Sequence, residues 1–267
     1  MLMLIGSMKE LKVVGTELTE LNMRFKEGGL QLNRTIIFNG INGLEAFDLI
    51  VDTVTKEPPG KTDYRQSMPF RSGSYNMAKV INRPTFDDRT TVYTCQLIEK
   101  DTEQLDKILT AINNWLLSPV EAVLQDTATP EYHFLGECLS VVPASNENGY
   151  VELTITFKCY PYKIFNTPIS ELEWDSIVFP IDVIPVTDFV IATGETFQID
   201  NICSTPVEFT SKGDYNSCTV EVNGTTYALN KNGKAGFVLQ PGLNNITIEA
   251  VSPSPSNLTI DYVRKEL

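Results

Sequence analysis

The sequence predicts a mainly β protein: an N-terminal β-sandwich-like domain with one α-helix and a long extended arm, followed by a smaller C-terminal β-sandwich. Short segments in which polar and apolar residues alternate, separated by turn residues, fill most of the chain. A single segment has the periodicity of a helix. Charge also divides the chain, since residues 1–165 hold 16 basic and 21 acidic residues (net -5) and residues 166–267 hold 5 and 13 (net -8). We therefore expect two domains, 9–165 and 166–267.

Composition sets the class of protein. The 267 residues are 42% hydrophobic and 21% charged, which is typical of a globular chain and excludes a disordered, collagen-like or coiled-coil protein. A formal charge of -13 argues against nucleic acid as a specific partner, because an acidic protein repels phosphate. No segment approaches the roughly 18 apolar residues of a membrane span. Met1 to Ser7 lacks a basic leader, so we expect no signal peptide and leave it out of the fold.

Three segments of the first domain predict strands. Arg34 to Phe38 runs into Asn39-Gly40, and Asn42-Gly43 follows, a dipeptide that supplies the positive φ angles of hairpin turns. Thr90 to Ile98 alternates polar and apolar residues, and Val151 to Cys159 does so more regularly. Apolar residues at every second position, many of them β-branched, indicate half-buried strands.

One amphipathic helix is predicted after Asp101, which can serve as its N-cap. Apolar residues then recur at helical spacing: Leu105, Ile108, Leu109, Ile112, Trp115 and Leu116. Ser118-Pro119 ends the helix. We expect it to pack on a sheet, with Trp115 in the core rather than on a ligand.

The segment from Asp52 to Asp88 has many polar residues, several prolines and glycines, and no clear periodicity. A stretch this long with little structure is uncommon inside a compact domain. Two interpretations remain open. The segment is either an extended element that contacts a partner or a long hairpin loop.

Short strands and dense turn signals continue after a proline-rich connection that contains Pro168, Pro180 and Pro185. Asn223-Gly224 and Pro241-Gly242 are among these turn signals. No helical pattern occurs in this part of the sequence, which predicts a small β-sandwich.

The sequence contains no motif for catalysis. It has no G-x-S-x-G elbow, P-loop or G-x-G-x-x-G segment. The single histidine, His133, is five residues from Cys138, which would place the two on opposite faces of a strand. The five cysteines form no C-x-x-C pair, so we expect reduced thiols, and Asp87-Asp88 lacks the spacing of a calcium loop. We predict a non-enzyme with no catalytic, metal or cofactor-binding residues and no cofactor.

Four ordered features of the first domain resemble the distal tail protein family of long, non-contractile-tailed bacteriophages. They are a strand with Phe38 to Ile41, a loop from Met68 to Tyr75 similar to the family's Pro-Gly-x-x-Gly, a helix end at Ile112 to Leu116, and a closing strand from Thr156 to Tyr162. Phe70 stands where the family commonly has glycine.

The second half resembles the galectin-like or carbohydrate-binding-module-like sandwich that family members often carry. Similar strands are Phe197 to Asn201, Thr205 to Val207, Val220 to Gly224 and Leu239 to Ile246. The region from Ala228 to Phe237 is shorter than in many relatives.

The resemblance implies a structural protein of the virion tail tip, assembled in the host cytoplasm. It implies a hexameric ring of N-terminal domains around the DNA channel, with C-terminal domains projecting outward, that links the tail tube to the adsorption apparatus of the baseplate. The implied partners are the protein itself, the tail tube protein, and tail-associated or receptor-binding proteins. In such a ring, we expect the segment from Asp52 to Asp88 to reach the adjacent subunit.

A carbohydrate-binding module or adhesin is the alternative, with host-surface carbohydrate as the partner of the C-terminal sandwich. Sugar sites need exposed aromatic rings, and this part of the chain offers Trp174, Tyr215, Tyr227 and Tyr262. Trp174 lies within the proline-rich connection, where packing is the better interpretation. A hydrolase is a third reading, but no pair of acids is marked for that role. Specific sugar-binding residues are not predicted.

Overall fold

The computed structural model describes residues 23–26, 29–32, 34–67, 69–70, 72–76, 78, 83–98, 102–144, 150–171 and 186–267. Outside these residues lie Met1 to Ser7, Met68, Arg71, Asp101 and Trp174. Contacts divide the chain into two compact units, 1–33 and 34–267. In the first unit, β1 (Met23–Lys26) pairs with β2 (Gly29–Leu32) in an antiparallel hairpin.

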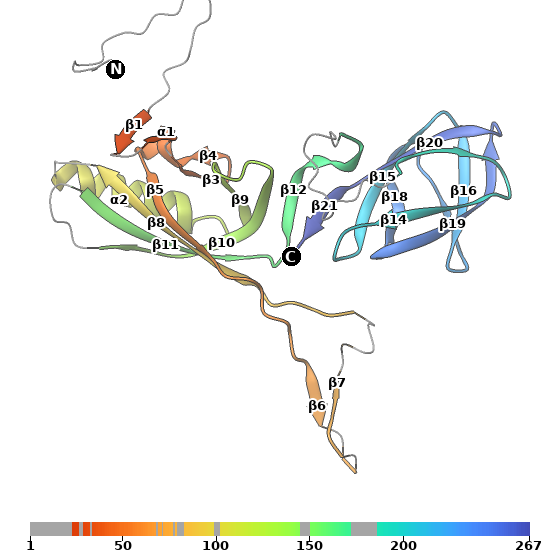
Figure 1. The fold of residues 1–267 in the computed structure, drawn as a ribbon, viewed down its shortest axis with the longest axis horizontal. Coiled ribbons are helices and arrows are strands. Elements are labelled where there is room, and N and C mark those ends of the chain that lie inside the picture. Colours follow the sequence, from red (N-terminus) through yellow and green to blue (C-terminus); the bar gives the residue numbers. More distant parts are fainter. Residues whose placement is uncertain are drawn as a thin grey trace, which may run out of the picture. The chain divides into compact units, whose positions relative to one another are not determined.

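The second unit begins with an antiparallel sheet in the order β4-β3-β9-β10-β11-β8-β5, called here the first sheet (Figure 1). Its strands are β3 (Ile36–Phe38), β4 (Ile41–Asn42), β5 (Ile50–Lys56), β8 (Arg89–Ile98), β9 (Ala122–Asp126), β10 (Tyr132–Pro143) and β11 (Tyr150–Cys159). On β11, Val151, Leu153, Ile155, Phe157 and Cys159 are buried, as the alternation predicts. On β8 the buried face carries Tyr93, Cys95 and Leu97, whereas Val92 lies half-buried on the other face.

The first sheet curls until its two ends meet. The Val51 backbone N–H of β5 donates to the Arg34 carbonyl before β3 at 2.7 Å, and the Thr35 hydroxyl donates to the Leu49 carbonyl at 2.8 Å. Across the interior, the rings of Phe38 and Phe157 lie 5.2 Å apart. The predicted sandwich-like arrangement is therefore made by one curled sheet, and the mainly β class is confirmed.

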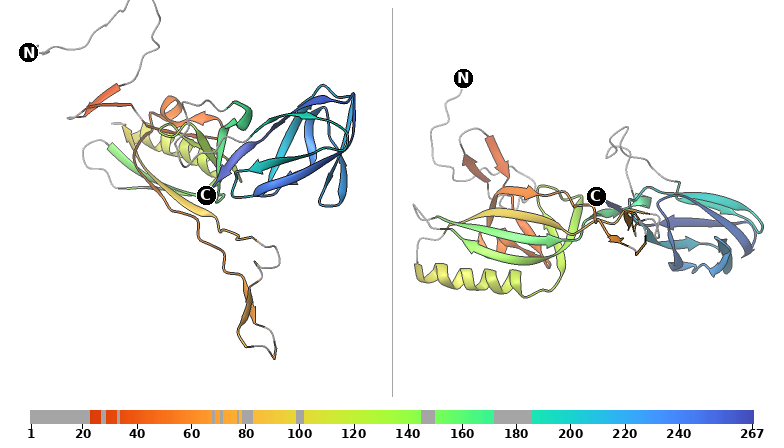
Figure 2. Two further views of the ribbon diagram at one scale, coloured as in Figure 1. Left: turned by 45° about the vertical axis from the view of Figure 1, so that its right-hand side comes forward. Right: turned by 90° about the horizontal axis from the view of Figure 1, so that it is seen from below.

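The predicted helix is α2 (Thr102–Leu117), and it lies along the first sheet (Figure 2). Ile112, Trp115 and Leu116 are buried, and Leu105, Ile108 and Leu109 pack partly against the same core. The Trp115 indole N–H donates to the Phe38 carbonyl at 2.9 Å, which satisfies its polar atom inside the core. Trp115 is a core residue, as predicted. Among the described residues, no helix is long and apolar enough to cross a membrane.

The two Asn-Gly pairs have different roles. Asn39 and Gly40 take positive φ angles of 50° and 76° and connect β3 to β4 in the predicted tight turn. The Asn42-Gly43 pair instead begins a short helix, α1 (Gly43–Phe47), because the Asn42 side chain accepts the Leu44 backbone N–H at 3.0 Å. The sequence did not predict α1, since an N-cap asparagine before glycine has the same pattern as a turn.

The C-terminal sandwich is confirmed by two four-stranded sheets, β13-β20-β15-β18 and β14-β19-β16-β17. The strands of the sandwich are β13 (Asp188–Ile191), β14 (Thr196–Asn201), β15 (Val207–Gly213), β16 (Ser217–Val222), β17 (Thr225–Ala228), β18 (Asn232–Leu239), β19 (Gly242–Ser252) and β20 (Ser256–Asp261). Their inner faces form one core that includes Phe209, Val220, Leu239, Ile248 and Ile260.

Two further strands extend the hydrogen-bonded pairing of the first sheet from β10. β12 (Lys163–Pro168) pairs with β10 through Tyr132 and Phe165, and β21 (Val263–Glu266) pairs with β12 through Lys163 and Glu266. The 3-10 helix η2 (Ile169–Glu171) follows β12. The division into domains 9–165 and 166–267 stays a prediction, and its boundary falls within β12.

Candidate functional site

Of the segment from Asp52 to Asp88, the residues up to Lys56 belong to β5, and the described residues of 57–88 form a two-stranded ribbon, called here the arm, which continues β5 and β8 beyond the first sheet (Figure 1). The Glu57 N–H donates to the Thr90 carbonyl at 3.1 Å, and the Asp87 N–H donates to the Gly60 carbonyl at 2.8 Å. Farther out, β6 (Arg65–Ser67) pairs with β7 (Ser74–Asn76). Of the two interpretations left open, a long hairpin describes the backbone, and contact with a partner stays a proposal.

No described residue between Asp52 and Asp88 is buried. Tyr64 is 63% exposed, and the side chain of Phe70 is fully exposed. A two-stranded hairpin is at best marginally stable in water when no core supports it. The arm therefore has backbone pairing but lacks the apolar burial that stabilises the rest of the chain.

Phe70 lies in the tip loop between β6 and β7 with a φ angle of 63°. A bulky side chain rarely takes this left-handed conformation, which glycine adopts without cost. Phe70 thus takes a backbone conformation that favours glycine, and Gly73 supplies a second positive φ of 83°. Strained residues of this kind concentrate at functional sites. The sequence marked Phe70 only as a departure from a pattern, because exposure cannot be read from residue type.

Polar contacts hold the middle of the arm together. The Thr62 hydroxyl donates to Asp87 at 2.8 Å, and Arg65 pairs with Asp63 at 2.7 Å. A shallow groove of about 420 Å³ follows them, lined by Lys61, Thr62, Asp63, Arg65, Asn76, Ala78, Arg83 and Pro84. The arm thus presents polar sides and an aromatic tip, which suits contact with a protein surface.

His133 and Cys138 do not form a catalytic pair. His133 Nδ1 lies 2.6 Å from the Asn166 side-chain oxygen, while the Cys138 thiol lies 3.7 Å from the Ser140 carbonyl. Burial raises the pKa of Cys138 to about 11, which keeps the thiol protonated and unreactive. Asp87 and Asp88 have different partners: Asp87 accepts from the Thr62 hydroxyl, and Asp88 pairs with Lys158 at 3.2 Å. Among the described residues, no three metal-ligating side chains come together.

Of the aromatic residues proposed for sugar binding, the three tyrosines that the structure describes do not form a platform on the sandwich. Tyr215 and Tyr262 are buried, and the ring of Tyr227 packs 4.8 Å from that of Phe237. The sandwich has a groove of about 470 Å³, which includes Pro206, Glu208, Val238, Tyr262 and Lys265.

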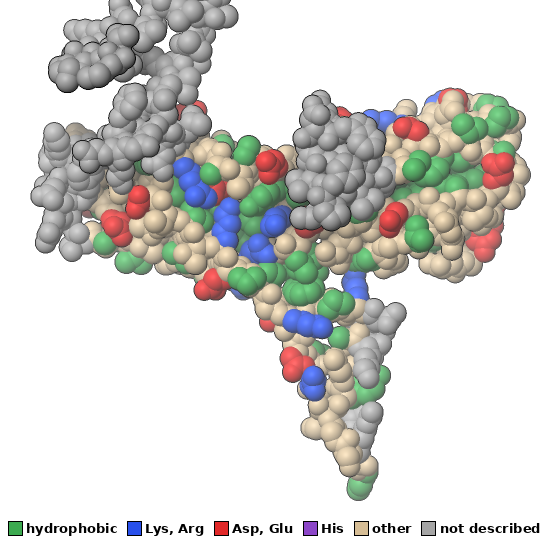
Figure 3. All heavy atoms as spheres, viewed as in Figure 1, with side chains coloured by type: hydrophobic (Ala, Val, Ile, Leu, Met, Phe, Trp, Pro, Cys, Tyr) green, Lys and Arg blue, Asp and Glu red, His purple; other side chains and the backbone are tan. Residues whose placement is uncertain are grey.

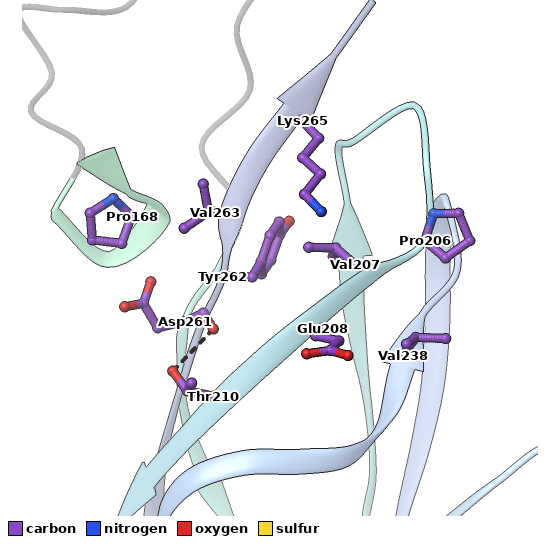
Figure 4. Close-up of a pocket in the computed structure, with 10 residues that line it drawn as sticks. All are labelled: Pro168, Pro206, Val207, Glu208, Thr210, Val238, Asp261, Tyr262, Val263 and Lys265. Carbon is purple, nitrogen blue, oxygen red and sulfur yellow. Dashed lines mark hydrogen bonds between the residues drawn. The ribbon is translucent and has the colours of Figure 1, made fainter. Parts of the chain in front are cut away.

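Figure 4 shows Tyr262 in this groove, flanked along the chain by Asp261 and Val263. Its hydroxyl donates to the Asp200 carbonyl at 2.8 Å, so the ring is held in place by the sandwich itself. Because Tyr262 is 4% exposed, the groove offers a sugar no open aromatic face.

The fold is similar to that of one solved phage protein. The crystal structure of the SPP1 Dit protein, described as a paradigm of the hub adsorption apparatus in phages that infect Gram-positive bacteria, matches with a TM-score of 0.57 and 12% identity, over 88% of this chain and 99% of that chain. The phage P2 baseplate in its activated conformation with Ca matches with a TM-score of 0.37 and 10% identity, over 87% of this chain and 97% of that chain. Comparison with family models and with curated protein sequences finds no match.

Proposed function

We propose that this chain is a structural, non-catalytic protein of a phage tail. It forms a hexameric hub at the distal tip that links the tail tube to the adsorption apparatus. Two independent observations support the proposal. The fold is similar to that of SPP1 Dit over nearly all of that protein, and the sequence motifs of the distal tail family lie in the same order along the chain.

The exposed arm is the observation that best supports assembly into a ring. A closed ring requires heterologous contacts, in which one surface of a subunit meets a different surface of its neighbour. A ribbon with an exposed aromatic tip and no core of its own gains most by docking on such a neighbour. The arm of each subunit therefore contacts the next one around the ring.

In this assembly, residues 9–165 form the ring and residues 166–267 project from it. The partners are the tail tube protein on one side and tail-associated or receptor-binding proteins on the other. The net charge of -13 suits a ring that surrounds passing DNA, because bound phosphates would slow the genome. The protein belongs to the virion tail tip and assembles in the host cytoplasm.

Solution mass tests the ring. Light scattering after size exclusion, over a concentration series, should give about 180 kDa for six copies of 29.8 kDa. A chain that stays at 29.8 kDa at every concentration would refute self-assembly. Deletion of Pro58 to Asp63 should reduce the mass toward the monomer while the thermal unfolding transition is kept, because no residue of the deleted segment is buried. An intact ring after this deletion would show that the arm is dispensable.

Binding of host-surface carbohydrate by the sandwich is the second candidate. It is favoured by the groove beside Glu208 and Lys265, whose polar groups could bind hydroxyls. A glycan array probed with the whole protein tests it, and a silent array would remove this candidate.

A further inference from the structure

Five cationic side chains gather at one end of the first sheet, and we call them the basic cluster: Arg34, Lys56, Arg89, Lys163 and Arg264. Arg34 lies two residues before β3 and Lys56 ends β5, while the other three come from β8, β12 and β21. Lys and Arg side chains also gather over the first sheet in the face drawn in Figure 3. Such a concentration of positive charge contrasts with a chain of net charge -13.

Three aromatic rings connect the basic cluster. Lys56 and Lys163 lie 5.3 and 5.4 Å from the centre of the Tyr132 ring. Arg89 lies 5.0 Å from the Phe134 ring, and Arg264 lies 3.8 Å from the Phe165 ring. The rings of Phe134 and Phe165 lie 5.6 and 6.0 Å from that of Tyr132, so these four cations lie against connected rings. Arg34 joins them because it shares Asp126 with Lys56. Aromatic faces attract cations but do not cancel their charge.

Two carboxylates pair with the basic cluster. Asp126 accepts from Arg34 and lies 3.3 Å from Lys56, and Glu266 lies 3.2 Å from Arg264. Lys163 and Arg89 form no ion pair among the described residues.

Arg89 is the strongest indication of a missing partner. It is 6% exposed, and among the described residues its Nε atom has no hydrogen-bond partner. Burial lowers the pKa of this guanidinium. An unpaired buried charge is costly, and a buried guanidinium normally pairs with a carboxylate or phosphate.

We propose that the basic cluster binds a carboxylate-bearing segment of a partner protein. Lys163 and Arg89, which form no ion pair among the described residues, favour an anionic partner, and a guanidinium group suits bidentate contact with a carboxylate. A nucleic acid is disfavoured, because its phosphates extend past this small surface onto the rest of an acidic chain, which a short carboxylate-bearing segment does not reach. This surface is additional to the arm, so its failure would leave the ring proposal standing.

Binding of labelled octaglutamate to the whole protein tests the proposal, with fluorescence anisotropy as the measurement. Octaglutamate should bind in low NaCl and dissociate in high NaCl (about 50 and about 300 mM), because salt screens exposed charges. Lys163→Gln should weaken binding about fivefold, and Lys163→Arg should keep it, because the charge is retained. Thermal unfolding confirms that both variants are folded.

Lys212→Gln is the matched control, because it removes the same charge from an exposed position on β15 of the sandwich. It should leave binding unchanged. Equal losses in Lys163→Gln and Lys212→Gln would overturn the proposal, as would no binding of octaglutamate to the wild-type protein. An oligothymidylate of equal charge that binds as tightly would assign the cluster to nucleic acid. A lower solution mass for Lys163→Gln would assign it to a second copy of this chain.

Discussion

The arm and the C-terminal sandwich are both built from paired antiparallel strands, but they differ in what stabilises them. In the sandwich, Val207 and Phe209 of β15 are buried on one face while Glu208 faces solvent. In the arm, every residue of β6 is exposed, and β7 has no buried residue. The two regions share backbone hydrogen bonding, and only the sandwich has a core.

This difference indicates where the stability of the chain resides and where its surface remains incomplete. Hydrophobic burial is the dominant favourable contribution to folding, so the sandwich needs no partner to hold its shape. The arm obtains comparable burial only from outside the chain. Substitutions in the sandwich should therefore affect unfolding, and substitutions in the arm should affect assembly.

The largest loss of stability is expected for Phe209→Ala. Phe209 is 2% exposed, and its ring lies 5.0 Å from that of Phe237. Removing a buried phenylalanine ring costs about 3–5 kcal/mol, because it loses burial and leaves a cavity. Urea unfolding measures the change. A loss below about 1 kcal/mol would mean that the sandwich does not depend on this core.

A smaller loss is expected for Asp126→Asn, at the end of the first sheet where the arm begins. Burial opposes the ionisation of Asp126, but hydrogen bonds from Arg34 and the Ala128 N–H and the charge of Lys56 outweigh it and lower its pKa. Replacement removes charge-assisted hydrogen bonds and should reduce the free energy of unfolding by about 2 kcal/mol at neutral pH.

The pH dependence of this contribution follows from the lowered pKa. Asp126 stabilises the fold fully above the pKa of an unfolded aspartate, about 3.9, and this stabilisation is lost as the pH falls through the lower folded value. Urea unfolding at several pH values should show the wild-type advantage over Asp126→Asn shrinking below about pH 4. An advantage that is constant down to the lowest pH would contradict the ionic role.

Phe70→Gly should separate stability from assembly. Glycine relieves the strained φ angle of 63°, so the isolated subunit should unfold as before or gain up to about 1 kcal/mol. Loss of the exposed ring should nevertheless shift the assembly toward smaller mass. Size exclusion with light scattering and a thermal melt give the two readouts. Unchanged assembly would show that the ring of Phe70 makes no contact between subunits.

The smallest effect on unfolding is expected for Arg65→Ala. Arg65 pairs with Asp63, but both side chains are more than half exposed. An exposed ion pair of this kind contributes at most about 1 kcal/mol and often less. A thermal melt should therefore change little. A large destabilisation would mean that the arm is stabilised from within.

The sequence predicts local elements where periodicity is strong. The alternation of polar and apolar residues predicted the buried face of β11. The helical spacing of apolar residues predicted the face of α2 that includes Trp115. Periodicity could not resolve the arm, because a ribbon without a buried face has no apolar pattern. The curling of the first sheet could not be predicted either, because the hydrogen bond between Val51 and Arg34 joins residues that no local pattern relates. The basic cluster was missed for the same reason, because Arg34 and Arg264 lie at opposite ends of the sequence.

A cross-linking experiment at the tip of the arm tests the central claim most directly. A photoreactive benzoylphenylalanine replaces Phe70, which is fully exposed, and a matched control replaces Val190, which is 70% exposed on the sandwich. After irradiation of the assembled protein, a denaturing gel should show a ladder of products between copies for position 70 and far less for position 190. Products at position 70 that remain monomeric in an assembled sample would contradict an arm that contacts its neighbour.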